Sequence, residues 1–404
     1  MSLRERVLEA LKKSAPYGLD VDISEFLVEQ PRIESSSSVL SSEIEESVES
    51  KVGIKPSKSH YVQLDQTALY GFMRSAVERY GVKIMPLRVA IERTDLAKQL
   101  SWRLLKPDSD KYTALAYLYG GELGYFIYVP KGVKVPTPLY TCLVLKSERR
   151  VQLVHNVIYV DDDAEAHVVS GCTVPHGLKE GLHVGISEFY VGKRARLTFS
   201  MIHSWAEGLH VRPRTAVRVE EGGEYVSYYM IYSPIASLQT NPKVELESGA
   251  KLYAASVVAG RSRAHIDVGT VAKLNGSGSR AELVSRVVAF DESQIYARGD
   301  IYGNASESVG HIECLGLMAS PKAFISSIPI VSSRNPTNRL SHEAAIGVIA
   351  QEEIEYLMSK GFTEDEARAI IIRGFMNIDA PGIPLSVKKE IERLTALIAA
   401  GGAL

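Results

Sequence analysis

The chain has 404 residues, of which 45% are apolar and 23% charged, and its formal net charge is -2. This composition is typical of globular proteins and excludes a wholly disordered chain. The charge excludes the broad basic excess of most nucleic-acid-binding proteins, and the sequence has no run of about eighteen apolar residues that would cross a membrane.

The first predicted region, residues 1–127, is mostly helical. It begins MSLRERVLEALKKSAPYG, in which Leu and Val recur at helical spacing between charged residues. The segment lacks the uninterrupted apolar stretch of a signal peptide, so we expect a cytoplasmic protein. The three cysteines, Cys142, Cys172 and Cys314, are too few and too scattered for a disulfide framework.

The second predicted region, residues 128–337, consists of short β-type runs joined by tight turns of Gly, Asp, Asn or Ser. The run after each turn begins at Ala164, Ala195, Glu224, Ala250, Ala281 and Glu307, at spacings of 26 to 31 residues. A repeat of this length predicts stacked coils of a β-solenoid, since each coil must bury its apolar face against its neighbours. A β-sandwich with evenly spaced hairpins is the alternative, but turn chemistry that recurs at one phase of the repeat favours the solenoid.

The third predicted region, residues 338–404, is helical. Residues 351–360 form one expected helix that ends at Gly361, and Thr363 with Glu366 makes a capping-box pattern before a second. A third is expected at 386–399. Helices this short must pack on the solenoid, on a partner or on each other.

The segment LSHEAAIGVIAQEEIEYLMSKGFTEDEARAIIIRGF, residues 340–375, closely resembles the C-terminal signature of the SufB/SufD family of iron-sulfur cluster assembly proteins. YVPKGVKVPTPL at 128–139, GCTVP at 171–175 and the stretch 182–205 are also similar to SufB. The resemblance implies a mainly β fold with a right-handed parallel β-helix core and helical ends. It further implies dimerisation through the C-terminal part of the core, and docking of the ABC-type ATPase SufC on the C-terminal helices. The expected docking residues are Ile370, Ile371, Ile372 and Phe375.

The same resemblance assigns roles to single residues. Cys314 in HIECLG matches the SufB cysteine thought to take part in cluster formation, and His342 and Glu343 match the histidine and glutamate of the SHEA motif. Cys172 matches a cysteine motif that receives sulfur. Two SufB features are missing, because PKAFIS at 321–326 replaces a CGAH-like segment and the N-terminal cysteine cluster is absent.

From these matches we expect a scaffold rather than an enzyme. It would hold a transient iron-sulfur cluster through Cys314, His342 and Glu343, and a homodimer would do the work of the SufB–SufD pair. The expected partners are SufC, a cysteine-desulfurase-type sulfur donor and apo iron-sulfur proteins. No GxxxxGK[ST] motif is present, so ATP hydrolysis would come from SufC.

The repeat length gives an independent check on the site. Cys314 and His342 are 28 residues apart, so adjacent coils would hold them about 4.8 Å apart if their phases match. Cys172 lies 142 residues before Cys314, or five coils, which is about 24 Å along the solenoid. If Ser341 to Ala344 is a regular strand, His342 and Glu343 point to opposite faces.

Two other functions are consistent with parts of the sequence. One is a SufD-like accessory protein without a cluster of its own. The other is a β-helix polysaccharide lyase or hydrolase, since such folds host this chemistry. That enzyme would need paired carboxylates on one exposed face of the solenoid.

Overall fold

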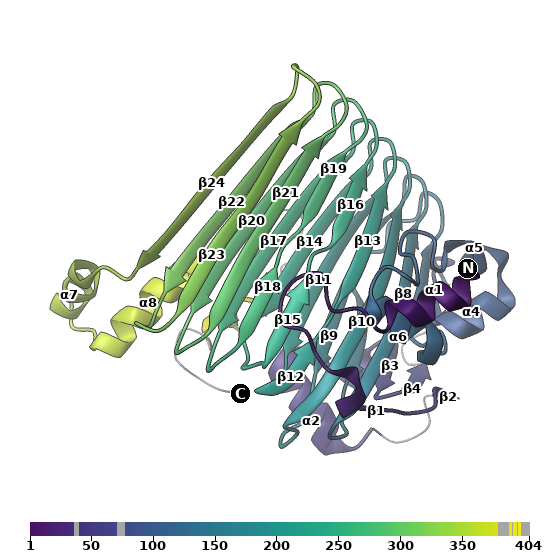
Figure 1. The fold of residues 1–404 in the computed structure, drawn as a ribbon, viewed down its shortest axis with the longest axis horizontal. Coiled ribbons are helices and arrows are strands. Elements are labelled where there is room, and N and C mark those ends of the chain that lie inside the picture. The colour runs from purple at the N-terminus through teal and green to yellow at the C-terminus, as the bar shows by residue number, and fades with distance from the viewer. Residues whose placement is uncertain (36–39, 71–76, 379–387, 390, 394, 397–404) are drawn as a thin grey trace.

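The computed structural model describes residues 1–35, 40–70, 77–378, 388–389, 391–393 and 395–396. Two sheets of parallel strands face each other and wind into a β-solenoid, with helices at both ends (Figure 1). The strand register advances by 27 to 31 residues per coil. The predicted mainly β solenoid is therefore confirmed.

One sheet, called sheet B, contributes one strand to each of the solenoid's coils. Its strands in order are β7 (Leu139–Val144), β9 (Glu165–Thr173), β11 (Arg196–Ser204), β14 (Glu224–Ile231), β17 (Lys251–Gly260), β20 (Arg280–Ala289), β22 (Val309–Met318) and β24 (Arg339–Val348). β24 continues the solenoid past residue 337, where the sequence analysis places the start of a helical region. The SHEA motif therefore lies on a strand.

The opposite sheet, called sheet A, has a more broken pattern because several coils carry two short strands. Its strands are β6 (Tyr125–Val129), β8 (Arg150–Val160), β10 (Glu180–Val191), β12 (Gly208–Val211), β13 (Arg214–Val219), β15 (Ser237–Thr240), β16 (Lys243–Leu246), β18 (His265–Val268), β19 (Val271–Leu274), β21 (Gln294–Gly303) and β23 (Phe324–Ser333).

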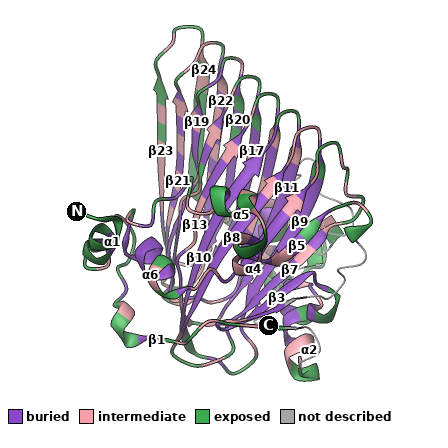
Figure 2. Cartoon of the chain, turned by 90° about the vertical axis from the view of Figure 1, so that its right-hand side faces the viewer, coloured by how far each residue is buried: buried purple, intermediate pink, exposed green. Residues whose placement is uncertain are grey.

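Apolar side chains alternate along the strands and fill the space between the two sheets. On β22, for example, Ile312 and Cys314 are buried in the central core, whereas His311 and Glu313 face outward. This period of two is the pattern that strands require, since successive side chains point to opposite faces. Figure 2 shows a buried interior whose last strands, β23 and β24, become intermediate or exposed.

Residues before the solenoid form a mixed α and β region, which differs from the mostly helical region expected. The elements are α1 (Leu3–Ala10), η1 (Ile23–Glu25), β1 (Leu27–Val28), β2 (Arg32–Ser35), α2 (Ser42–Val52), η2 (Pro56–Lys58), β3 (Tyr61–Leu64), β4 (Thr67–Tyr70), β5 (Lys83–Pro86), α4 (Leu87–Arg93), α5 (Asp95–Leu100) and α6 (Lys111–Tyr119). Within them, β3 pairs with β7 and β5 pairs with β6. These short strands cover the first coil and leave fewer unpaired backbone groups at that end.

A buried ionic group joins this N-terminal region to the solenoid. His155 on β8 contacts Glu122 through Nδ1 at 2.8 Å and Glu188 through Nε2 at 2.9 Å. Glu188 on β10 is fully buried and also accepts hydrogen bonds from the backbone N–H groups of Trp102 and Leu104. Burial alone would lower the pKa of His155, but its hydrogen bonds with the two carboxylates raise it to about 9.

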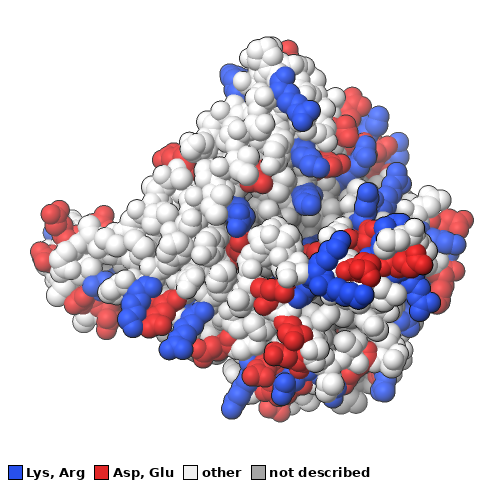
Figure 3. All heavy atoms as spheres, in the orientation of Figure 1, with Lys and Arg blue, Asp and Glu red and all other residues white. Residues whose placement is uncertain are grey.

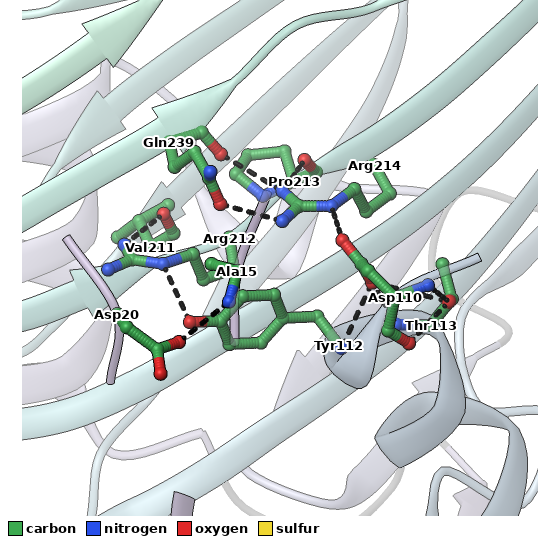
Figure 4. A network of polar contacts seen from close by, with 10 residues as sticks. All are labelled: Ala15, Asp20, Asp110, Tyr112, Thr113, Val211, Arg212, Pro213, Arg214 and Gln239. Atoms are coloured by element: carbon green, nitrogen blue, oxygen red, sulfur yellow. Dashed lines mark hydrogen bonds and ion pairs between the residues drawn. The ribbon is translucent and has the colours of Figure 1, made fainter. Parts of the chain in front are cut away.

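A second polar network fixes α6 and the segment after α1 against sheet A (Figure 4). The fully buried Arg212 donates to the hydroxyl groups of Tyr112 and Ser237 and to the backbone oxygen of Leu19. Its charge is thus surrounded by hydrogen-bond acceptors, as a buried guanidinium requires. The sequence gave no indication of this anchor, because its residues come from distant parts of the chain.

Two helices follow β24 directly. They are α7 (Gln351–Ser359) and α8 (Glu364–Met376), and Thr363 caps α8 through the predicted capping box with Glu366. The predicted helix at 386–399 falls largely outside the described residues. None of the helices in the described ranges is long and apolar enough to cross a membrane.

Candidate functional site

Cys314 lies on the inner face of β22, one coil before the end of the solenoid. Its neighbours in register are Ser285 on β20 and Ala344 on β24. The residue is 3% exposed, and burial raises the pKa of its thiol, an effect opposed by a hydrogen bond with Ser327 on β23. The thiol is therefore protonated at neutral pH unless a metal or a base takes its proton.

His342 lies on the same inner face, on the neighbouring strand β24. It pairs in register with Ile312, two residues before the position opposite Cys314. Strands about 4.8 Å apart and a rise of about 3.3 Å per residue place the two Cα atoms roughly 8 Å apart. The predicted neighbourhood of Cys314 and His342 is confirmed, but this coil is 30 residues long, so the two are offset diagonally.

Glu343 points to the outer face of β24, as a regular strand requires. Its partner in register is Glu313 on β22, and His311 lies nearby on the same face. Potential ligand atoms of His311, Glu313 and Glu343 lie within 4.8 Å of one another. Within one chain, the three predicted ligands therefore divide into an inner pair, Cys314 and His342, and an outer carboxylate.

Cys172 lies on the inner face of β9, five strands away from β22 in sheet B. Five steps at the usual strand spacing give about 24 Å, as predicted from the repeat. Its Sγ is 3.5 Å from Sδ of Met201 on β11, and burial raises the pKa of its thiol. In register, its column leads to Gly316 rather than to Cys314, so the two cysteines are displaced by two residues along their strands.

A line of inner-face side chains nevertheless connects the two cysteines. Met201 is in register with Tyr229 on β14, and the same column continues through Ser256 on β17 and Ser285 on β20 to Cys314. The sequence analysis missed these residues, because a column can be identified only when the register of every coil is known to one residue.

Two cavities follow this column inside the solenoid. The larger, of about 60 Å³, is lined by Met201, Tyr229 and Ser256 together with His183 and His203. The smaller, of about 10 Å³, is also lined by Ser256 and extends to Cys314. Space for small molecules is therefore distributed from the neighbour of Cys172 to Cys314.

His183 and His203 are neutral at physiological pH. Burial lowers the pKa of His183 to about 3 and holds that of His203 well below its ordinary value. His203 lies beside Cys172 in register, and its Nδ1 contacts the hydroxyl of Tyr229 at 2.9 Å. A neutral imidazole at this position offers a base within the sulfur-lined part of the core.

The four predicted docking residues on α8 are only partly available to a partner. Ile372 is 4% exposed and packs with Met376 in a cluster on the outer face of sheet B, and Phe375 packs against the same cluster. Ile370 and Ile371 are half-buried. Intramolecular packing therefore accounts for Ile372. Three large apolar side chains are more exposed, namely Tyr356, Met358 and Phe362.

The fold and these positions define a class: a parallel β-solenoid with helical ends that carries buried sulfur ligands along its interior and mixed metal ligands on its last two coils. The family model described as "SUF system FeS cluster assembly, SufBD core domain" matches residues 143–375. The chain belongs to this SufBD family of iron-sulfur cluster assembly proteins.

Curated relatives agree with this assignment over most of their length. An "Iron-sulfur cluster assembly SufBD family protein" of Methanothermobacter thermautotrophicus is 36% identical over 397 residues, covering 96% of each chain. A protein of the same description from Archaeoglobus fulgidus is 42% identical over 347 residues, 85% of this chain and 92% of the relative. The "Iron-sulfur cluster assembly protein SufB" of Bacillus subtilis is 28% identical over 387 residues, 92% and 82% of the two chains.

Proposed function

We propose that the protein is a cytoplasmic scaffold, not an enzyme, on which an iron-sulfur cluster is built where two copies meet. The observation that carries this proposal is the pair Cys314 and His342 on one face of the last two coils. Thiolate and imidazole are both accepted ligands of cluster iron. A two-fold axis at the end of the solenoid would bring together two of each, enough to hold a cluster and few enough thiolates to release it.

The end of the solenoid supports pairing with a second copy. Among the described residues, β23 pairs only with β21 and β24 only with β22, so each leaves one edge open. Ile330, Ile346 and Val348 are 43%, 41% and 66% exposed there. β23 itself has no charged residue, and Figure 3 shows an almost uncharged surface over it. Open strand edges with exposed apolar side chains favour association.

The interior column supports sulfur delivery from Cys172 to Cys314. In this proposal a cysteine-desulfurase-type donor supplies sulfur at Cys172, where the neutral His203 accepts the thiol proton. The two cavities and their polar lining then provide a route within the core. The distance of about 24 Å between the strands excludes direct contact between the two thiols, so the route needs intermediate positions.

A partner ATPase would act on the same end of the molecule. Cys314 is buried, so cluster building requires the last coil to open. α7 follows β24 after only two residues, and Tyr356 and Met358 on α7 are exposed by 63% and 43%. We propose that SufC docks on α7 and the following turn, and that its ATP-driven movement pulls β24 away from β22. The finished cluster would then pass to apo iron-sulfur proteins.

The test is anaerobic reconstitution of the full chain with iron and sulfide, alone and with SufC. We expect broad visible absorption and bound iron in the wild type, and their loss in Cys314→Ala. Cys142→Ala is the matched control, because Cys142 is equally buried but lies on the outer face of sheet B. An equal cluster yield from Cys314→Ala would remove this thiol from the mechanism, and retained SufC binding without any cluster would identify a SufD-like accessory.

A further inference from the structure

Three side chains on the outer face of the last two sheet B strands form a compact group of metal-binding type. His311 and Glu313 are two residues apart on β22, and Glu343 is the partner of Glu313 on β24. One ligand atom from each lies within 4.8 Å of the others. All three are partly or fully open to solvent, so an ion would reach them without any movement of the core.

The electrostatics of this group lack a compensating positive charge. Glu313 and Glu343 are directly opposite on neighbouring strands, an arrangement in which like charges destabilise a sheet. Arg286 on β20 forms an ion pair with Glu313 and offsets one of the two negative charges. A bound divalent cation would neutralise the remaining repulsion.

The imidazole of His311 is already oriented by a neighbour. Its Nδ1 lies 2.8 Å from the hydroxyl oxygen of Ser341, the residue opposite it on β24. Histidines that bind metals usually have their second ring nitrogen fixed in this way, which sets the tautomer and the ring direction. The contact leaves Nε2 as the nitrogen for a ligand.

We propose that His311, Glu313 and Glu343 bind one divalent first-row metal ion, and that in the assembly reaction this ion is ferrous iron. The inference rests on the proposed function for the identity of the ion. One imidazole and two carboxylates suit ions between hard and soft in character, whereas Mg²⁺ and Ca²⁺ prefer oxygen ligands alone.

The position of this site explains why the predicted ligands divide between two faces. Glu313 and Cys314 are consecutive residues whose side chains leave opposite sides of β22. Iron on the outer face would be held within one strand's thickness of the thiol and still be separated from sulfur in the core. Opening of β24 would remove that separation, since Glu343 and His342 are on the strand that moves.

Anaerobic titration of the metal-free full chain with Co²⁺, without sulfide, tests the site separately from cluster assembly. We expect one equivalent bound with the spectrum of nitrogen and oxygen ligands, unchanged in Cys314→Ala. His311→Ala and Glu313→Gln should weaken binding by on the order of tenfold to a hundredfold. Glu282→Gln is the matched control, because Glu282 is beside His311 in register on β20 but outside the group. Circular dichroism would establish that each variant is folded.

Three results would overturn the inference. These are unchanged Co²⁺ affinity in both His311→Ala and Glu313→Gln, an equal loss in Glu282→Gln, or a thiolate-to-cobalt band that disappears in Cys314→Ala. Failure of the proposed function is distinguishable from these results: Co²⁺ would still bind the wild type and depend on His311, while reconstitution would yield no cluster.

Discussion

The buried contact of His155 with Glu122 and Glu188 makes a pH-dependent contribution to stability. The pKa of His155 is raised from 6.5 to about 9 by the two carboxylates. A raised pKa means that the stabilisation is complete below about pH 6.5 and is lost as the pH rises through about 9. The difference corresponds to about 3 kcal/mol, because one pKa unit is worth about 1.4 kcal/mol.

The perturbation that isolates this contribution is His155→Gln. Removing one partner of a buried ion pair costs about 3–5 kcal/mol, so we expect the variant to be less stable by that amount at pH 6. At pH 10 the deficit should shrink by about 3 kcal/mol, because the wild type has then lost the charge on His155. The lowered pKa of Glu122 contributes only at acid pH and does not affect this range.

Urea denaturation followed by circular dichroism at pH 6, 8 and 10 measures the effect as a free energy of unfolding. His176→Gln is the control, since His176 is exposed in the turn after β9, and it should follow the wild type at each pH. Parallel pH profiles for the wild type and His155→Gln would refute the reasoning, whatever the absolute loss of stability.

Three further changes test other parts of the structure. Gly124→Ala should cost about 2–5 kcal/mol in denaturation experiments, because Gly124 has φ +128° and a Cβ there would meet the His155 carbonyl oxygen at 2.1 Å; Gly347→Ala, with nothing within 4 Å, should be nearly neutral. Ile346→Lys should shift the chain from dimer to monomer in light scattering without lowering its helix and strand content, and a persistent dimer would place the interface elsewhere. Tyr356→Asp should weaken SufC binding at least tenfold in calorimetry while the dimer persists, and unchanged affinity would exclude α7 as the docking surface.

The repeat and its coil length were predictable because turn residues recur at one phase of the sequence. The runs expected to begin at Glu224 and Ala281 fall within one residue of β14 and β20. From there, the neighbourhood of Cys314 and His342 followed by counting one coil. The opposite orientations of His342 and Glu343 followed from a strand through the SHEA motif.

What the sequence did not reveal depends on register and on distant contacts. Coils here vary between 27 and 31 residues, so an average period cannot show that Glu313 rather than Cys314 is opposite Glu343. The anchors around Arg212 and His155 escaped prediction for a different reason. Their partners come from segments with no repeat, where no periodicity limits which side chains meet.

The open edges of β23 and β24 also have a consequence for handling the chain in the cell. A freshly synthesised copy carries a template on which any extended peptide can add, and dilute conditions prolong that exposure. β24 bears Arg339, His342 and Glu343, whereas β23 bears no charge, so protection against unwanted addition is concentrated on one of the two edges. Overproduction without a matching supply of partners should therefore yield insoluble material, with β23 as the segment where such aggregates begin.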